Sequence, residues 1–331
     1  MFLSIVIPHY NLEQKLLERC IDSIISLNLS AGNYEIIVVD DGSAAPPHWV
    51  EEKYKKEPVK FICACHGGPG AARNRGIYEA SGKYVQFVDA DDYLFAGDAI
   101  HKCIEILGRE KPQILRFRYK VCTGSDTTPP TTTPKFGNTI SGALYMSKNN
   151  LSGSPCTYFF ARELAIKKNI NFPENRFHED EEFNTILHYH AQTLIESDAQ
   201  IYAYCTRNGS TTANNTPTFE EERIEDLLSI IERIQFFSDS LMRNSNIIQQ
   251  KALRRKTAML CVDAILNMLY AGYKSRRIYS ICTKRLAQNR LYPLPAAGYS
   301  FKYRIFRSLA NSKTGLSILR LITPKKKPLK R

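Results

Sequence analysis

The sequence predicts an α/β fold in which helices cover both faces of a doubly wound, mostly parallel sheet. Short apolar runs recur along the N-terminal part of the chain, and segments with helical spacing separate them. Strands that alternate with helices in this way are typical of parallel sheets. Runs that are apolar throughout indicate strands buried on both faces. The predicted strands lie at residues 3–7, 34–39, 59–63 and 84–88.

The segments between these strands carry the periodicity of helices. Leu12, Leu16, Cys20 and Ile24 recur at helical spacing within residues 12–29, and Asn11 is a possible N-cap. The Thr-, Pro- and Gly-rich residues 123–139 predict an exposed loop. Further helices are expected near Val50, over residues 71–80, 159–166 and 183–190, and from Phe219 onward, with another strand at residues 199–205.

The length of 331 residues permits one large domain with a smaller appendage. We expect a first domain at residues 1–215, divided into halves at 1–110 and 111–215, and a helical region at 216–331. The charge follows this division. Residues 264–331 hold 16 Lys and Arg and no Asp or Glu, so the rest of the chain has 29 basic residues against 33 acidic ones. The net charge of +12 therefore belongs to the C-terminal segment, which favours contact with an anionic surface.

Cysteine usage and apolar run lengths indicate the compartment. The nine cysteines are scattered without a CxxC pair, which is typical of reduced thiols in the cytosol. The N-terminus lacks the basic region of a signal peptide, and no apolar run reaches the roughly 18 residues of a spanning helix. We therefore expect a cytoplasmic protein.

Three predicted strands end in polar clusters, at residues 8–11, 40–41 and 89–92. Ligands of such sheets bind beyond the carboxyl ends of the strands. Asp89, Asp91 and Asp92 are hard oxygen donors of the kind that Mg²⁺ and Mn²⁺ prefer. For this short motif alone, a solvated acidic turn is the alternative. Their position at a strand end favours a metal that binds a diphosphate.

Two further segments fit a nucleotide. A carboxylate of the Asp40-Asp41-Gly42-Ser43 segment can accept hydrogen bonds from a base or a ribose, although an Asp-Gly turn is the alternative. Gly68 and Gly70 would let the backbone approach a phosphate, and Arg73 can pair with an anionic oxygen. The segment is neither a Walker A motif nor GxGxxG.

Taken together, these segments resemble glycosyltransferase family 2, whose inverting enzymes have the GT-A fold. The resemblance extends over about residues 1–215 and implies a Rossmann-like, mixed but mostly parallel sheet, followed here by a helical C-terminal extension. It rests on the order and spacing of residues 6–11, 38–43, 67–76 and 82–92.

The resemblance implies a role for each matching donor-side residue. Pro8 and Tyr10 match positions that flank the nucleobase, and Asp41, beside Asp40, matches the carboxylate that reads uracil. Arg73 matches a position near the donor. Asp89 matches a position near the ribose that can also hold the metal, and Asp91 matches the principal ligand of Mn²⁺ or Mg²⁺. His66 stands where the family often has Asn, which leaves the contact made by that side chain open.

On the acceptor side, residues 178–183 resemble the family's Glu-Asp motif, and Asp180 matches the general base. Chemistry alone does not separate Asp180 from Glu179 or Glu181, and an acidic helix start is the alternative. Arg207 lies in a segment resembling one that closes over the diphosphate. His188 and His190 are two residues apart on a predicted helix and are expected to be structural.

Residues 299–322 predict two amphipathic helices rich in Lys and Arg, and a basic tail follows at 325–331. Such helices can lie on an anionic membrane surface, or they can pack on the catalytic domain. Many family members build bacterial surface polysaccharides on lipid carriers, so the resemblance implies a saccharide or lipid-linked acceptor. It also favours a peripheral position at the inner face of the cytoplasmic membrane.

The predicted function is transfer of a sugar from a nucleotide diphosphate, expected to be UDP, to an acceptor hydroxyl. A nucleotidyltransferase would instead release diphosphate from a nucleoside triphosphate, and the N-terminal motif lacks the Gly-rich basic signature of those enzymes. A nucleic-acid-binding protein would use the basic tail. That tail has no recognisable reading motif, so no nucleic acid partner is expected.

Overall fold

The computed structural model describes residues 1–30, 32–122, 128, 130, 133–151, 153–206 and 216–324. The chain divides into two compact units. The first comprises Met1–Tyr145 and Gly153–Arg207, and the second comprises Met146–Ser152 and Asn208–Arg331. The boundary predicted after residue 215 falls at the end of a segment outside the described residues.

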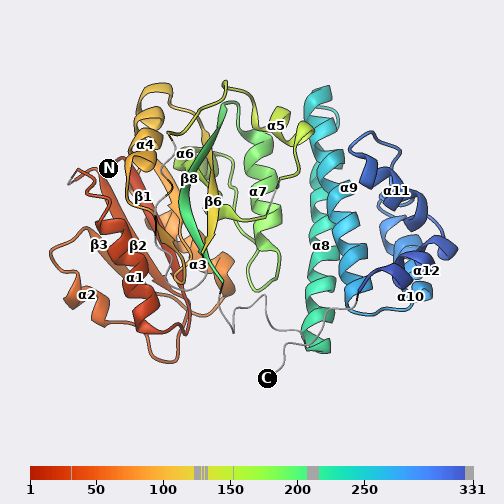
Figure 1. The fold of residues 1–331 in the computed structure, drawn as a ribbon, viewed down its shortest axis with the longest axis horizontal. Coiled ribbons are helices and arrows are strands. Elements are labelled where there is room, and N and C mark those ends of the chain that lie inside the picture. The colour runs from red at the N-terminus through yellow and green to blue at the C-terminus, as the bar shows by residue number, and fades with distance from the viewer. Residues whose placement is uncertain are drawn as a thin grey trace. The chain divides into compact units, whose positions relative to one another are not determined.

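The first unit is built on one eight-stranded sheet with the order β3-β2-β1-β4-β7-β6-β8-β5. Figure 1 shows β3, β2 and β1 side by side in the N-terminal part of this sheet. β3-β2-β1-β4 are parallel and β6 is parallel to β8, whereas β7 runs antiparallel to both of its neighbours and β5 is antiparallel to β8. The sheet is therefore mixed and mostly parallel, as predicted. The strands are β1 (Leu3–His9), β2 (Tyr34–Asp40), β3 (Val59–Cys63), β4 (Tyr84–Phe87), β5 (Tyr93–Leu94), β6 (Ile114–Cys122), β7 (Tyr158–Ala161) and β8 (Leu194–Cys205).

The four predicted N-terminal strands form the parallel half of this sheet. β1 lies between β2 and β4, and Ile5, Val6 and Ile7 of β1 are completely buried. α3 packs on β1 and β2. Gly76 permits this close packing, because a Cβ there would lie 2.2 Å from a Val6 methyl carbon. The helices of the first unit are α1 (Gln14–Ile25), α2 (Trp49–Lys53), α3 (Gly68–Glu79), α4 (Asp98–Glu110), α5 (Gly142–Lys148, which runs into the second unit), α6 (Arg162–Lys167) and α7 (Glu179–His190).

Two local predictions were wrong. The helix expected over residues 159–166 begins only at Arg162, because Phe159 and Phe160 belong to β7 and are buried in the core. Asn11 does not cap α1, which begins at Gln14 after Glu13. Asn11 instead has a positive φ of 45°, and its side-chain oxygen accepts a hydrogen bond from the Ala44 amide. This residue therefore ties the end of β1 to the turn after β2.

The second unit is helical and has its own apolar core. Ile231, Ile265, Met268 and Leu316 are completely buried within it. Asn246 begins α9 with a capping box in which its side chain and that of Gln249 bond each other's backbone amides. Within the described residues, no helix is both long and apolar enough to cross a bilayer. The helices are α8 (Pro217–Leu241), α9 (Ile247–Tyr270), α10 (Ser275–Ile281), a π-helical turn (Cys282–Leu286), α11 (Phe301–Ala310) and α12 (Lys313–Ile322).

Candidate active site

The three polar clusters predicted at strand ends meet at one edge of the sheet. His9 at the end of β1 is in register with Asp40 at the end of β2. On the other side of β1, Val6 pairs with Phe87, and the amide of Val88 continues the ladder to Val6. Asp89 follows directly. Since β2, β1 and β4 are parallel neighbours, their carboxyl ends and the side chains that follow them share one rim.

Asp40 holds this rim together from within. Its carboxylate is completely buried, and it accepts hydrogen bonds from the Ser43 hydroxyl at 2.5 Å and from His9 Nδ1 at 2.8 Å. Burial alone would raise the pKa of Asp40, but the bonds from Ser43 and His9 hold that pKa below its ordinary value. This geometry gives Asp40 a structural part and lends no support to a direct donor contact.

Asp41 is nearly buried beside an aromatic pair. Its two carboxylate oxygens accept hydrogen bonds from the amides of Gly67 and Gly68, each at 2.9 Å. His66 Nδ1 lies 2.9 Å from Asp41 Oδ2, and its ring stacks on Tyr10 with centroids 4.5 Å apart. The rings of Tyr10 and His66 are both about half exposed. An aromatic platform next to a hydrogen-bonding carboxylate suits a planar heterocycle.

Arg73 bridges two elements that are distant in the sequence. Its guanidinium donates to Asp89 at 3.0 Å and to Glu179 at 2.7 Å. Burial alone would lower the pKa of Arg73, but Asp89 and Glu179 raise it above its ordinary value. The end of β4 is thereby joined to the start of α7. Arg73 Nε is buried with no hydrogen-bond partner among the described residues.

Gly70, three residues before Arg73, lies against another part of the backbone rather than against open space for a phosphate. A Cβ on Gly70 would lie 2.5 Å from the backbone oxygen of Pro173. Asn74 holds the same segment, because its side chain donates to the Phe172 carbonyl and accepts from the Phe172 amide. The start of α3 therefore clamps the chain that leads into α7.

We expect Gly70→Ala to destabilise the first unit by about 1–3 kcal/mol, because the added methyl group meets fixed backbone. Gly108→Ala is the matched control, since a Cβ at this helical glycine meets nothing within 4 Å. The control should be neutral or stabilising by up to about 1 kcal/mol. Urea unfolding of both variants checks this, and equal stabilities would contradict the clamp.

The Asp89–Asp92 cluster divides into accessible and buried carboxylates. Asp92 is buried, and it accepts hydrogen bonds from the Tyr202 hydroxyl at 2.5 Å and from the Cys205 amide at 2.7 Å. Burial raises the pKa of Asp92 to about 8. Asp89 and Asp91 remain partly exposed, and Arg19 donates to the backbone oxygen of Asp91.

Asp89 and Asp91 fit a divalent cation that also binds a diphosphate. They supply hard carboxylate oxygens with access to solvent. Throughout the described ranges, no three His, Cys, Asp or Glu side chains form a group able to hold a metal ion. Mg²⁺ and Mn²⁺ sites often use one or two carboxylates and complete their coordination with water and substrate phosphates.

The four acids at the start of α7 are not equivalent. Glu179 and Glu182 are buried, and Glu179 is committed to Arg73. Asp180 and Glu181 are half-buried and both lie against Gly153, where a Cβ would be 2.9 Å from Asp180 Oδ2 and 2.8 Å from Glu181 Oε1. Of these four acids, Asp180 and Glu181 are therefore the two that solvent and a substrate could reach.

Comparison with known proteins identifies the domain that carries this rim. A sequence model described as "Glycosyl transferase family 2" matches residues 4–168. Residues 4–168 are a glycosyltransferase family 2 domain. The uncharacterized glycosyltransferase EpsJ of Bacillus subtilis (strain 168) is 31% identical over 212 residues, which are 61% of this chain and 60% of EpsJ. The match thus spans less than two thirds of that relative.

Solved structures of glycosyltransferases show the same GT-A fold. TarS 1-349 of S. aureus in complex with UDP-GlcNAc has a TM-score of 0.61 at 19% identity, covering 97% of this chain and 90% of that one. The mannosyltransferase PcManGT of Pyrobaculum calidifontis, in complex with GDP-Man and Mn²⁺, has a TM-score of 0.56 at 15% identity, covering 97% and 87%. Asp180 lies beyond the stretch that the family 2 model matches.

The rim carries several of the predicted site residues, in two groups of contacting side chains. Tyr10 reaches Asp41 through His66, and Arg73 contacts Asp89. Pro8, one residue before His9, lies at the same end of β1. Arg207 lies outside the described residues, and so does the basic tail at 325–331. His188, in contrast, is structural as predicted, because its ring is completely buried between Arg116 and the Asn184 carbonyl.

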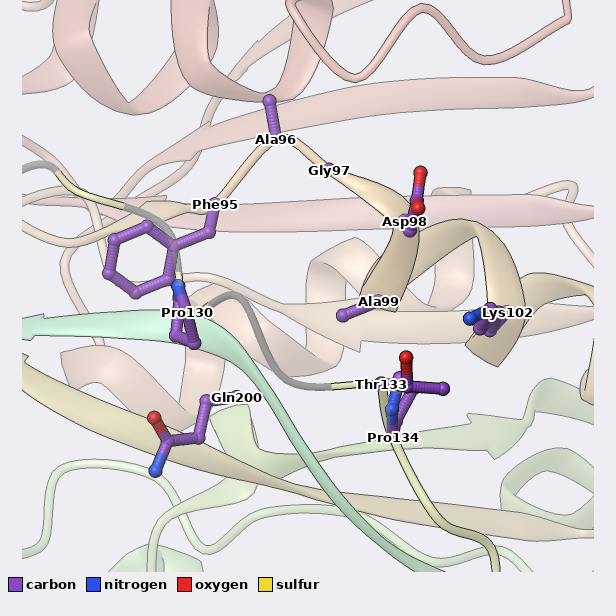
Figure 2. A pocket seen from close by; sticks show the side chains of 10 residues that line it. All are labelled: Phe95, Ala96, Gly97, Asp98, Ala99, Lys102, Pro130, Thr133, Pro134 and Gln200. Atoms are coloured by element: carbon purple, nitrogen blue, oxygen red, sulfur yellow. The ribbon is translucent and has the colours of Figure 1, made fainter.

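Sequence reasoning missed several residues at the rim. Arg19 and Tyr202 contact the acidic cluster from α1 and β8, and no local motif marks either of them. A cavity of about 250 Å³ lies elsewhere in the first unit (Figure 2), and the predicted donor, metal and acceptor residues are absent from its lining. It is lined by Phe95, Ala96, Gly97, Asp98, Ala99, Lys102, Pro130, Thr133, Pro134 and Gln200.

Proposed function

We propose that this chain is an inverting glycosyltransferase that moves a sugar from a nucleoside diphosphate, namely UDP, to an acceptor hydroxyl. One observation carries the proposal: Arg73 joins Asp89, on the donor rim, to the start of α7, where Asp180 lies. Donor-side and acceptor-side carboxylates thus belong to one hydrogen-bonded assembly. The presence of UDP-GlcNAc in the TarS complex supports a uridine donor.

Each donor group has a matching feature on the rim. The exposed ring of Tyr10, with Pro8 nearby, offers a surface on which a base can stack, and Asp41 offers it a carboxylate acceptor. Asp89 is accessible enough to accept a ribose hydroxyl while it holds Arg73. Asp91, with Asp89, would hold Mn²⁺ or Mg²⁺, which neutralises the charge that develops on the departing diphosphate. The Mn²⁺ in the PcManGT complex supports this assignment.

Asp180 is the proposed general base. Inversion needs one carboxylate beside the acceptor hydroxyl, on the opposite side of the sugar from the leaving diphosphate. Asp180 accepts the hydroxyl proton as that oxygen attacks the anomeric carbon, and the bond to the diphosphate breaks. Glu179 does not serve, because it is buried and bound to Arg73.

The proposal is tested by measuring UDP release from UDP-GlcNAc and other UDP-linked sugars in the presence of Mn²⁺. Asp91→Ala is expected to lower the rate at least a hundredfold, while Asp98→Ala, which changes an exposed acid at the start of α4, leaves it unchanged. Equal rates for wild type and Asp91→Ala would overturn the metal assignment. Release from GDP-linked sugars alone would overturn the uridine donor.

We further propose that α11 and α12 dock on an anionic membrane surface where a lipid-linked acceptor is used in surface polysaccharide or lipid-linked oligosaccharide assembly. α12 exposes Leu321 (86%) and Ile322 (67%), and α11 exposes Phe301 (67%). Exposed Lys302 and Arg320 lie on the same two helices. The chain has no acidic residue after Asp263. Its exposed cations can therefore bind anionic headgroups, while the exposed apolar side chains enter the lipid interface.

Sedimentation with vesicles tests the docking surface. The wild type is expected to bind vesicles containing phosphatidylglycerol, and Leu321→Ser with Ile322→Ser should weaken binding about tenfold or more. Phe236→Ser is the control, because Phe236 of α8 is also largely exposed but lies outside this basic surface. Equal binding of both variants, or equal binding to neutral vesicles, would contradict the proposal.

A further inference from the structure

The imidazole of His66 makes two contacts at once. Its Nδ1 lies 2.9 Å from Asp41 Oδ2 and 3.0 Å from the Asp41 backbone oxygen. Its ring stacks on Tyr10 at an interplanar angle of 22°. The backbone oxygen can only accept a hydrogen bond, so Nδ1 donates its hydrogen to that oxygen. His66 therefore places a flat ring with an N–H group between Tyr10 and Asp41.

A uracil ring that stacks on Tyr10 and donates its N3–H to the Asp41 carboxylate would need the place of the imidazole, whose Nδ1 lies 2.9 Å from Asp41 Oδ2. The two rings cannot share the site as it stands, because Tyr10 and His66 are 4.5 Å apart and an inserted base needs about 7 Å between its neighbours. Asp41 is only 3% exposed and already accepts bonds from the amides of Gly67 and Gly68. Those amides belong to the backbone, so the imidazole is the group beside the carboxylate that can leave.

The surroundings of His66 allow its imidazole ring to leave while the backbone at this residue stays in place. The His66 side chain is 54% exposed, so it can rotate into solvent. Its backbone is packed closely against Gly42, where a Cβ would lie 2.8 Å from the His66 nitrogen. Gly42 has a φ of +73°, which glycine adopts at little cost. The backbone at residue 66 is therefore held while its side chain has room to turn.

We propose that His66 is an intramolecular stand-in for the nucleobase, which occupies the base position in the free protein and must swing out when uridine diphosphate binds. This inference rests on the proposed function, because it takes Tyr10 and Asp41 as the base site. By competing with the base, the imidazole lowers the affinity for the donor. It also covers the Asp41 carboxylate until a base with an N–H group replaces it. Each ligand that carries such a base must displace the imidazole from its stack on Tyr10 and from its hydrogen bond to the Asp41 backbone oxygen.

Calorimetric titration of uridine diphosphate with Mg²⁺ tests the proposal. Removing the competitor in His66→Ala is expected to tighten binding about five- to tenfold, the equivalent of a modest stack and hydrogen bond. His101→Ala, which removes an exposed histidine of α4, should leave the affinity unchanged. Pyrophosphate, which has no base, should bind wild type and His66→Ala equally.

A second measurement follows the ring itself. In histidine ring NMR spectra, assigned with His66→Ala, uridine diphosphate should shift the His66 signals as the imidazole leaves Tyr10 and Asp41, and pyrophosphate should not. Unchanged or weaker binding of uridine diphosphate by a folded His66→Ala variant would overturn the stand-in. A wild-type chain that binds pyrophosphate but no uridine diphosphate would instead overturn the uridine donor of the proposed function.

Discussion

Asp180→Asn is expected to lower the rate of UDP release about a thousandfold while leaving the affinity for UDP within about twofold of the wild type. The amide keeps the shape of the side chain but cannot accept the acceptor proton. Asp180 lies in the first turn of α7, whereas the carboxylate of Asp41 is held by the amides of Gly67 and Gly68. Steady-state rates with the best UDP-linked donor, together with calorimetry, separate the two quantities.

Glu181→Gln is the matched control for this experiment. Glu181 neighbours Asp180, is also half-buried and also lies against Gly153. If Asp180 is the base, Glu181→Gln should cost less than about tenfold in rate. A large loss in Glu181→Gln with a small one in Asp180→Asn would move the base to Glu181 and overturn the assignment drawn from the family motif.

Arg73→Met is expected to destabilise the first unit by about 3–5 kcal/mol. The substitution removes the cation that pairs with Glu179 and Asp89 but keeps most of the apolar bulk. Glu179 is only 8% exposed, so its charge would be left without compensation in the interior. Asp89 is 37% exposed and remains partly solvated. Urea unfolding measures the change in the free energy of unfolding.

Two further variants decide whether the uncompensated charge of Glu179 causes the loss of stability in Arg73→Met. Arg109→Met removes an arginine that also pairs with two carboxylates, Glu105 and Glu110, but on the surface. It should cost no more than about 1 kcal/mol. Adding Glu179→Gln to Arg73→Met should recover part of the loss. If Arg73→Met costs no more than Arg109→Met, the buried bridge does not stabilise the rim.

The sequence predicted the parts of this protein that depend on neighbours in the chain. The apolar strands β1 to β4 and the acids that follow β2 and β4 were all predictable, because parallel strand ends must share an edge. β6 was missed although it carries a signal. From Leu115 to Val121 its apolar and basic residues alternate strictly, which is typical of a strand.

Other features depend on partners that no local pattern reveals. Arg73 and Glu179 are 106 residues apart, and nothing near either residue predicts that they meet. Gly70 was predicted to leave room for a phosphate, but its neighbour is the Pro173 carbonyl, in the segment that leads into α7. Asp40 and Asp41 are adjacent and chemically identical in the sequence. Only the fold shows that Asp40 bonds Ser43 and His9 while Asp41 lies beside the aromatic pair.

The central claim is that carboxylates from β2 and β4 form one site for a nucleoside diphosphate and its cation. Calorimetric titration of UDP in the presence and absence of Mn²⁺, on wild type, Asp41→Asn and Asp91→Asn, tests it most directly. We predict one UDP site per chain whose affinity Mn²⁺ increases, weaker UDP binding in Asp41→Asn, and loss of the Mn²⁺ effect in Asp91→Asn. UDP binding that is the same in all three proteins would contradict it.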